Sequence, residues 1–500
     1  MANDPTMSPF GLPDFSPDVV LDAPAREAVR LLASGGDERI VLDPASGLNR
    51  YFSGPYPRRT IAFASSTAND MSREAFARTV ELAAAPRAGY GERLDGLRQR
   101  IRAAYRLPDA CRIVFAPSGT DLEYVALAAS AAEAPVAVHN ILLGADEVGS
   151  GCRLSAHGMF FAPVTGRGVA VTAGARVAGL EQVSLVDIPV RCAEGLAHDS
   201  ATIAAGIRGE IAAARAMGRR ALVHVVHGSK TGLILPELPE IDRLLAEHGD
   251  AVSLVVDACQ ARITSEALHA YLDRGAIVFL TGSKFMGGPP FSGFALVPPA
   301  VADSTGPLPA GLAEISRRAE WPDGWPGREQ LAEEDNPGLW LRLEAAIFEL
   351  ERFQALPAAQ VERTVEAFQR ALARRVIEPL GLERVEPFSP GHEGEAREHP
   401  IEMRTLATLD VSRLPQARTF DDAQRLHRSL ALAGLRLGQP VKSVRDADGN
   451  WGGTLRIGPS MPQFVAWSRL DDEALAATLE QAMAGIADVL AGHALSEAAE

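Results

Sequence analysis

The sequence has few cysteines, no excess of basic residues and no long apolar run. Its four cysteines, Cys111, Cys152, Cys192 and Cys259, lie far apart and form no CxxC spacing. They are interpreted as buried thiols in a reducing compartment, not as a disulfide framework or a zinc site. The net charge of −15 argues against nucleic-acid binding, which needs a basic face. No uncharged apolar stretch reaches the roughly 18 residues of a membrane-spanning helix, so no membrane span is predicted.

The first residues, MANDPTMSPFGLPDFSPDVV, also lack a basic region followed by an apolar stretch, so no secretion signal is expected. At 500 residues the chain is too long for one compact core, which predicts at least two domains. A hydrophobic content of 47% and a charged content of 23% are ordinary for a soluble globular protein. These features predict a cytoplasmic protein of enzyme size.

The segment between Ser253 and Gly293 carries the most suggestive chemistry. Two apolar runs, at 254–256 and 276–280, have the pattern of strands buried on both faces, and they lead to Asp257 and to Lys284. Ligands bind at the carboxyl ends of such strands. A lysine there can form a Schiff base, and a carboxylate can keep a pyridine nitrogen protonated; pyridoxal 5′-phosphate (PLP) needs both groups. Taken alone, the pair is equally consistent with a helix cap and a solvated loop lysine.

Two further strand ends carry polar, glycine-containing turns. The strand at 112–116 is followed by Ser118-Gly119-Thr120 and a helical run, and a helix N-terminus in this setting is a ready phosphate site. The same residues could serve only as a helix cap, with Thr120 or Asp121 in that role. The strand at 221–227 is followed by Ser229-Lys230-Thr231-Gly232.

The alternation of strands and helices over roughly 110–300 predicts a mostly parallel sheet with helices on both faces. Residues 301–335 are rich in Pro, Gly and acids and are interpreted as a boundary loop. The later pattern, with strands near 401–411 and 453–458, predicts a smaller α+β domain. The expected division is an N-terminal arm at 1–60 that packs with the small domain, a large domain at 61–335 and a small domain at 336–500.

The ordered set of strand-end motifs resembles the fold-type I PLP-dependent enzymes, specifically the class V aminotransferase and cysteine desulfurase branch. The likeness spans roughly residues 60–300 and one C-terminal motif. It rests on the segments 118–120, 229–232, 257–260 and 281–284. The resemblance implies a mostly parallel, seven-stranded sheet in a large α/β domain, a smaller α+β C-terminal domain, PLP as cofactor and a homodimer.

The resemblance also implies roles for residues around the PLP ring. Lys284 would hold the cofactor as a Schiff base and later move the α-proton of the substrate. Asp257 would pair with the pyridinium nitrogen. Gln260 would donate a hydrogen bond to the phenolic oxygen, and Ser229, often Asn in the family, would contact the same oxygen.

Five further positions match the family's binding residues. Gly119 and Thr120 would cradle the phosphate, and Thr281 and Ser283 would reach it, although Ser283 departs from the family's histidine. Arg456, in Thr454-Leu455-Arg456-Ile457-Gly458, would grip the substrate carboxylate through its planar guanidinium. The alternative interpretation of Arg456 is a surface arginine on an edge strand.

Two departures from the family pattern bear on the reaction. The region 147–151 holds no side chain that could stack on the PLP ring, and none of His157, Phe160 and Tyr90 is assigned to that place. Cysteine desulfurases need a nucleophilic cysteine between the lysine and the C-terminal arginine, and residues 285–500 contain none. The sequence therefore predicts no persulfide chemistry by that route.

The function expected from the resemblance is a PLP-dependent enzyme that acts on the α-amino group of an amino acid, with an aminotransferase as the favoured reaction. A PLP-dependent lyase (β-elimination, retro-aldol cleavage or decarboxylation) is the alternative, because the same residues serve all these reactions. A regulatory protein that has lost the cofactor is a further alternative, and the intact lysine, acid and glutamine argue against it. No metal, nucleic acid or membrane is expected as a partner.

Overall fold

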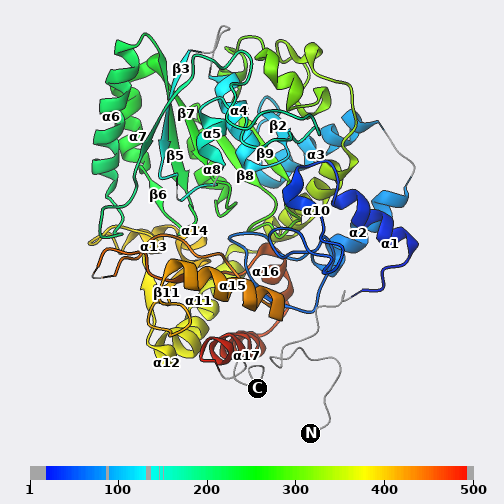
Figure 1. Ribbon diagram of the computed structural model, residues 1–500, viewed down its shortest axis with the longest axis vertical. Coiled ribbons are helices and arrows are strands. Elements are labelled where there is room, and N and C mark those ends of the chain that lie inside the picture. Colours follow the sequence, from blue (N-terminus) through cyan, green and yellow to red (C-terminus); the bar gives the residue numbers. More distant parts are fainter. Residues whose placement is uncertain are drawn as a thin grey trace.

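The computed structural model describes residues 19–85, 89–130, 137–145, 147–149, 151–446 and 448–492. The start of the expected N-terminal arm, residues 1–18, therefore lies outside the described residues. A larger part is built around an eight-stranded sheet, and a smaller part is built around a three-stranded sheet (Figure 1). None of the helices in the described part of the chain is long and apolar enough to cross a membrane.

The large sheet confirms the predicted mostly parallel arrangement. Its seven strands run in the order β2 (Arg112–Ala116), β9 (Gly293–Val297), β8 (Ile277–Thr281), β7 (Val252–Asp257), β5 (Arg220–His227), β3 (Val138–Leu143) and β4 (Ser184–Ile188). Along this path only β9 runs in the direction opposite to the other strands. The short strand β6 (Ile234–Leu235) pairs antiparallel with β5 and makes the eighth strand.

The central strands are mostly apolar because alternate side chains enter cores on both faces of the sheet. In β7, Leu254 and Val256 join one core and Val255 joins the other. The first core is closed by α3 (Tyr90–Tyr105), α6 (Ser200–Ala216), α7 (Leu238–His248), α8 (Ser265–Leu272) and α10 (Pro337–Gln354). The second is closed by α4 (Gly119–Ala129) and by apolar residues of the segment 308–331.

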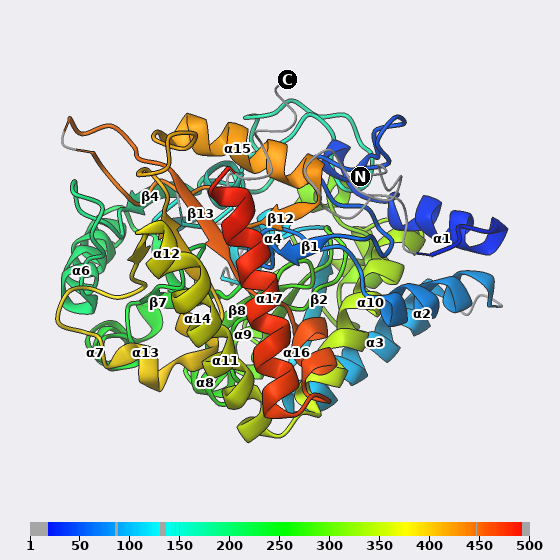
Figure 2. The same ribbon diagram turned by 90° about the horizontal axis from the view of Figure 1, so that it is seen from below.

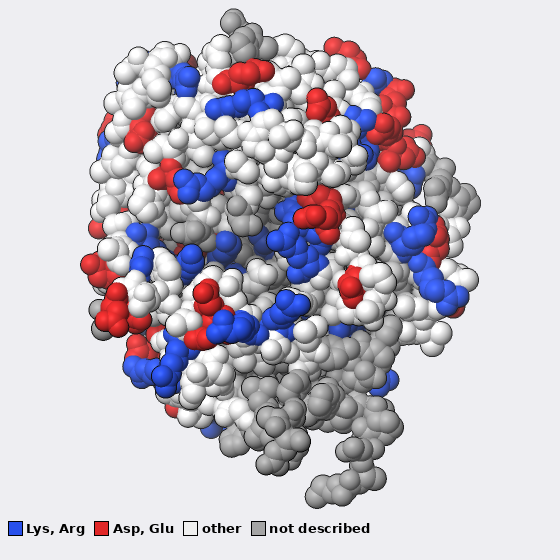
Figure 3. Space-filling view, in the orientation of Figure 1, with Lys and Arg blue, Asp and Glu red and all other residues white. Residues whose placement is uncertain are grey.

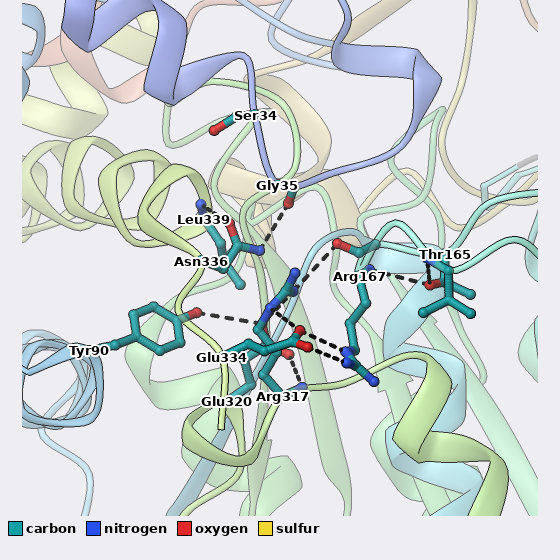
Figure 4. Close-up of polar contacts among 12 residues, drawn as sticks. Ser34, Gly35, Tyr90, Thr165, Arg167, Arg317, Glu320, Glu334, Asn336 and Leu339 are labelled. Atoms are coloured by element: carbon teal, nitrogen blue, oxygen red, sulfur yellow. Dashed lines mark hydrogen bonds and ion pairs between the residues drawn. The ribbon is translucent and has the colours of Figure 1, made fainter. Parts of the chain in front are cut away.

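The segment 301–336 is packed structure with a buried apolar centre, where the sequence predicts a boundary loop. It contains the 3₁₀ turns η3 (Ala310–Glu314), η4 (Arg318–Glu320) and η5 (Arg328–Gln330). Trp321 is fully buried and meets Trp325 edge to face at 4.9 Å between ring centroids. Polar contacts fasten the same segment: Arg317 donates to Glu320, and Tyr90 of α3 reaches Glu320 at 3.4 Å (Figure 4).

The smaller part is an antiparallel sheet covered by helices. Its strands are β10 (Glu383–Val385), β11 (Ala407–Asp410) and β13 (Thr454–Ile457). The covering helices are α11 (Ala358–Leu372), α15 (Phe420–Ala433) and α17 (Asp472–Leu490), and Figure 2 shows α17 lying beside α11. The strand expected near 401–411 begins only at Ala407, because Pro400 starts the short helix α14 (Pro400–Arg404).

The N-terminal region contacts both parts. Helix α1 (Ala23–Leu32) packs against α2 (Arg73–Ala84) and α10. Strand β1 (Ile61–Phe63) pairs parallel with β12 (Leu435–Leu437), which belongs to the smaller part. The polypeptide between α1 and β1 is thereby held near the junction of the two parts, where the cavity described below lies.

The Trp321–Trp325 cluster yields a stability prediction. Trp321→Ala leaves a large cavity in a fully buried site, so we expect the free energy of unfolding to fall by about 3–5 kcal/mol. The measurement is the urea midpoint followed by far-UV circular dichroism. Leu432→Ala on α15, where the side chain is 47% exposed, is the control and should change stability by less than about 0.5 kcal/mol. Equal losses in the two variants would show that Trp321 does not hold this core.

Candidate active site

The carboxyl ends of four parallel strands, β2, β5, β7 and β8, meet at one edge of the large sheet. Strand β7 lies between β5 and β8, and Asp257 at its end pairs in register with Val226 and Phe279. Lys284 follows the end of β8. The strands that carry Asp257 and Lys284 are therefore direct neighbours, as the sequence predicts.

A cavity of about 210 Å³ opens at this edge. Strand-end residues make up one part of its wall: Ser118, Gly119, Thr120, Lys230, Asp257, Cys259, Thr281, Ser283 and Lys284. The rest of the wall includes Arg39, Tyr51, Ser66, Thr67, Gln439 and Arg456. Figure 3 shows a hollow in the middle of this face with Lys and Arg side chains gathered around it. Seven of the nine residues predicted for the site line this one cavity: Gly119, Thr120, Asp257, Thr281, Ser283, Lys284 and Arg456.

Helix α4 begins directly against the ends of β7 and β8. Its N-cap is Ser118, whose side chain accepts from the Asp121 amide, and not Thr120 or Asp121 as considered from the sequence. A Cβ on Gly119 would lie 2.9 Å from Cys259 Sγ and 3.2 Å from Thr281 Cγ2, so this close approach requires glycine. Because the first amides of a helix have no partner within it, the N-terminus of α4 offers N–H donors to an anion in the cavity.

Asp257 accepts a hydrogen bond from the turn that follows it, and the two titratable side chains behind it are uncharged. Its Oδ1 accepts from the Cys259 amide at 2.9 Å. Behind it, His224 Nε2 of β5 lies 3.5 Å from Glu123 Oε2 of α4, and both side chains are buried. Burial, together with the charge of Asp257, raises the pKa of Glu123 well above its usual range. Burial lowers the pKa of His224 to about 4, although Asp257 opposes this shift. Both groups are therefore uncharged at neutral pH.

The backbone around Lys284 is tied to three other segments. Its carbonyl accepts from Asn69 Nδ2 at 3.3 Å. The amide of Phe285 donates to the Gln260 carbonyl at 3.2 Å, and the Phe285 carbonyl accepts from the Met461 amide at 2.7 Å. The lysine loop is thus fixed by the turn that follows β7, by the N-terminal region and by the smaller part of the molecule.

Two predicted site residues do not line this cavity in the described part of the chain. The Gln260 side chain is buried, donates to the Ser66 carbonyl at 3.4 Å and accepts from Arg262 at 3.3 Å. The Ser229 hydroxyl donates to Glu147 Oε2 at 2.9 Å. A third residue, Thr281, lines the cavity, but its hydroxyl donates to the Cys259 carbonyl at 2.6 Å.

Arg456 is a cavity residue and not a surface arginine, since only 2% of it is exposed. Its Nε donates to the Gln439 carbonyl at 2.6 Å and its Nη1 to the Lys230 carbonyl at 3.2 Å. Burial lowers the pKa of Arg456 to about 10, and the nearby Glu147 carboxylate opposes this shift. The guanidinium is therefore charged at neutral pH and oriented by two backbone carbonyls.

Lys230 is a cavity residue to which the sequence motif alone assigns no role. The chain has only three lysines, Lys230, Lys284 and Lys442, and the first two share this cavity. Burial lowers the pKa of Lys230 to about 8, and the charges of Arg456 and Lys284 lower it further, while Glu147 opposes them. The scarcity of lysine in the sequence is the signal that could have drawn attention to this residue.

The N-terminal region contributes side chains that no sequence motif reveals. Arg39 forms an ion pair with Asp37 at 2.6 Å, lies 3.5 Å from Ser118 Oγ and stacks over the Phe291 ring at 4.5 Å. Phe291 also lines the cavity and has a φ of 69°, an unusual backbone conformation for a bulky residue. Tyr51 lines the same wall.

None of the aromatic or imidazole candidates for ring stacking lines the cavity. His157 contacts Arg176 at 2.9 Å, Phe160 belongs to a core cluster and Tyr90 reaches Glu320. Two thiols do line it, those of Cys152 and Cys259. Burial raises the pKa of both thiols, so they are protonated at neutral pH and weak nucleophiles.

The chain resembles solved structures over most of its length. A complex of the cystine C–S lyase C-DES with cysteine persulfide shares 16% identity, covers 85% of this chain and 97% of that chain, and gives a TM-score of 0.53. Apo cysteine desulfurase from Thermococcus onnurineus shares 15% identity, covers 85% of this chain and 95% of that chain, and gives a TM-score of 0.51. Ureidoglycine-glyoxylate aminotransferase from Bacillus subtilis shares 15% identity, covers 88% of this chain and 98% of that chain, and gives a TM-score of 0.49. No protein-family model and no curated protein sequence matches.

At these identities the comparison shows the fold. The chain has the arrangement of a large, mostly parallel sheet and a smaller α+β part found in C-DES, which has been solved with glycine covalently linked to its PLP cofactor. The fold type I predicted from the strand-end motifs is therefore confirmed.

The shifted pKa of Lys230 gives a prediction for stability against pH. Its folded-state pKa is about 8, below the roughly 10.4 expected when unfolded. Below pH 8 the folded protein must bury a charge, and between about pH 8 and 10.4 it has lost a proton that the unfolded chain retains, so this unfavourable contribution fades as pH rises. We therefore expect Lys230→Met to melt at a higher temperature than the wild type at pH 7, by a margin that shrinks toward pH 10.

The control is Lys442→Met, at an exposed position, whose melting temperature should follow that of the wild type throughout. Differential scanning calorimetry from pH 7 to 10 makes the comparison. A difference between Lys230→Met and the wild type that is constant with pH would show that the buried charge of Lys230 does not cause it.

Proposed function

We propose that this protein is a PLP-dependent enzyme that acts on the α-amino group of an amino acid, and that its reaction is transamination. One observation carries the proposal: Lys284 and Asp257, at the ends of neighbouring strands, line the same cavity as the N-terminus of α4 and Arg456. A carbonyl-reactive amine, an acid, an anion cradle and a carboxylate clamp are the groups that a PLP enzyme needs.

The residues present fit PLP. The glycine at position 119, where a Cβ would collide with Cys259 and Thr281, lets the amides at the start of α4 line the cavity as a phosphate cradle. Thr120 and Ser283 line the same region, and Arg39 adds positive charge beside Ser118. Asp257 would pair with the pyridine nitrogen, and Lys284 Nζ would bind the carbonyl carbon. Bound PLP would supply an electron sink for the carbanion formed at the substrate α-carbon.

The remaining steps belong to side chains of this chain. Arg456, oriented by the carbonyls of Gln439 and Lys230, would hold the substrate α-carboxylate by a bidentate pair. That anchor would present the α-carbon to Lys284, whose amine would remove the α-proton once displaced from the cofactor. His224 and Glu123, both uncharged behind Asp257, place no competing ion next to its carboxylate.

The protonated Cys152 and Cys259 thiols support a reaction without a persulfide, in line with the absence of any cysteine after Cys259. A lyase reaction would use the same lysine, acid and arginine, and product analysis separates the two. With one amino acid and no acceptor, an aminotransferase forms about one equivalent of keto acid per site and stops until a second keto acid is added. Continuous release of ammonia or carbon dioxide, or cleavage to an aldehyde, would instead identify a lyase.

Lys284→Ala tests the central assignment. We expect the purified wild-type protein to show a visible absorption band with PLP, and borohydride reduction to attach the cofactor to Lys284, detected by peptide mass spectrometry. Lys284→Ala should lose the covalent attachment and on the order of 10³-fold or more of the turnover. Lys442→Ala is the matched control and should behave as the wild type. Attachment to Lys230, or full activity in Lys284→Ala, would contradict the assignment.

Gly119→Ala tests the phosphate cradle. A Cβ there would push Cys259 and Thr281 away from the start of α4, so we expect PLP affinity to fall by at least about tenfold. The affinity for pyridoxal, which lacks the phosphate, should fall less. Gly91→Ala on α3, where a Cβ meets nothing within 4 Å, is the control. Equal losses for PLP and pyridoxal would place the phosphate elsewhere.

We also propose that the protein works as a homodimer, which the resemblance to the family implies, and that it is cytoplasmic, which its composition and its scattered cysteines favour. Analytical ultracentrifugation of the PLP-loaded protein would measure the oligomeric state directly.

A further inference from the structure

The residues assigned so far bind the ends of the PLP molecule and leave its ring without a partner. Among the described residues, none of the three side chains considered from the sequence for ring stacking lines the cavity. Two aromatic side chains of the described wall, Tyr51 and Phe291, lie beside Arg39. The Arg39 guanidinium already covers the Phe291 ring at 4.5 Å from its centroid. The side chains near Asp257 and Lys284 are therefore of interest, and two of them are thiols.

Cys259 lies next to both the acid and the proposed phosphate cradle. Its amide donates to Asp257 Oδ1 at 2.9 Å, and its carbonyl accepts from the Thr281 hydroxyl at 2.6 Å. Its Sγ packs directly against Gly119, where a Cβ would lie only 2.9 Å away. The backbone of Cys259 is thus fixed, and its thiol is placed beside the positions proposed for the pyridine nitrogen and the phosphate.

Cys152 reaches the same cavity from another segment. It begins the short helix α5 (Cys152–Ala156) and directly follows the region 147–151, which holds no side chain able to stack on the ring. A Cβ on Gly149, which also lines the cavity, would lie 3.0 Å from Cys152 Sγ and 3.5 Å from Thr120 Oγ1. Cys152 packs with one core of the large sheet and Cys259 with the other. The two thiols therefore approach the cavity from different sides.

Both thiols lie close to the two groups that would bind the ring. Burial is the main cause of the raised pKa of each thiol; the charge of Asp257 adds to this shift, and the charge of Lys284 opposes it. A protonated thiol adds no charge that competes with Asp257, and it is a weak nucleophile toward the carbonyl carbon of PLP. Its polarizable sulfur makes favourable contacts with aromatic rings.

We propose that the thiols of Cys152 and Cys259 hold the PLP ring by sulfur–aromatic contacts, in place of a stacked aromatic or imidazole side chain. This inference rests on the proposed function and adds two binding residues to the same site. The contacts are non-covalent, and both sulfurs keep their protons. Since the phosphate binds at the start of α4, the thiols contribute to the affinity for the ring and not for the phosphate.

Alanine variants test these contacts, because the chain has only four cysteines and two of them, Cys111 and Cys192, do not line the cavity. Absorbance titration of the apo protein would measure the affinities for PLP and for pyridoxal, which has the same ring but no phosphate. Cys152→Ala and Cys259→Ala should each weaken binding of both compounds by a similar factor, about threefold to tenfold. Cys111→Ala and Cys192→Ala are the matched controls and should bind both compounds as the wild type does.

Thiol labelling gives a second readout that needs no variant. The apo protein and the protein with PLP fixed to Lys284 by borohydride are treated with methyl methanethiosulfonate at mildly alkaline pH. Peptide mass spectrometry follows each cysteine, with reaction times set so that all four are labelled measurably in the apo protein. PLP should slow the labelling of Cys152 and Cys259 by at least about fivefold. It should leave the partly exposed Cys192 unchanged.

The two measurements together decide the inference. If both alanine variants bind pyridoxal as the wild type does, or if PLP protects neither thiol, the inference is wrong while the proposed function stands. It is also wrong if the variants lose affinity for PLP alone, which would place the thiols at the phosphate. A variant whose apo form melts below the wild type is judged by the labelling result alone. If the wild type binds neither PLP nor pyridoxal, the proposed function itself fails.

Discussion

The parallel hydrogen bonding of β5, β7 and β8 is the constraint on which the site depends. Parallel pairing brings strand ends to one edge, and its register holds Asp257 beside Phe279, near the end of the strand that leads to Lys284. A slip of one residue would turn Asp257 to the opposite face of the sheet, because side chains alternate along a strand. The same slip would exchange Val255 with Leu254 and Val256 between the two cores, so the side-chain packing of both cores would have to change.

Buried arginines attach the rest of the molecule to this edge. Arg342 of α10 donates to the carbonyls of Leu32 and Gly35 behind α1 and to that of Phe291 in the cavity wall. Arg262, next to the β7 turn, donates to Thr405 Oγ1 at 2.9 Å and to the Pro459 carbonyl at 3.4 Å. Burying a guanidinium is costly, and several carbonyl acceptors offset that cost only when their segments are correctly placed. The cavity wall therefore forms only when the segments that these arginines connect, from both parts of the molecule, are correctly assembled.

The electrostatics of the site follow from which groups remain charged after burial. Glu123, His224, Cys152 and Cys259 are all held neutral by burial. The cations on the cavity wall and Asp257 are left to act on a ligand. The site thus combines one acid, placed by a strand end, with basic groups that come from the arm, the sheet edge and the smaller part. This distribution favours the binding of an anionic group in the cavity.

Local pattern was enough to identify the sheet, because apolar strands followed by polar turns repeat from residue 112 to 284, and this pattern depends only on burial and chain geometry. The ordered motifs singled out Asp257, Lys284, Gly119 and Arg456, and the structure brings all four to one cavity. The sequence pattern missed Arg39 and Tyr51, since no motif surrounds them and only the path from α1 to β1 brings them to the cavity. It could not place Ser229, Gln260 and Lys230 relative to the cavity, because adjacent residues in a turn point in different directions. Which of them faces a ligand is decided by tertiary contacts, such as the hydrogen bond from Ser229 to Glu147.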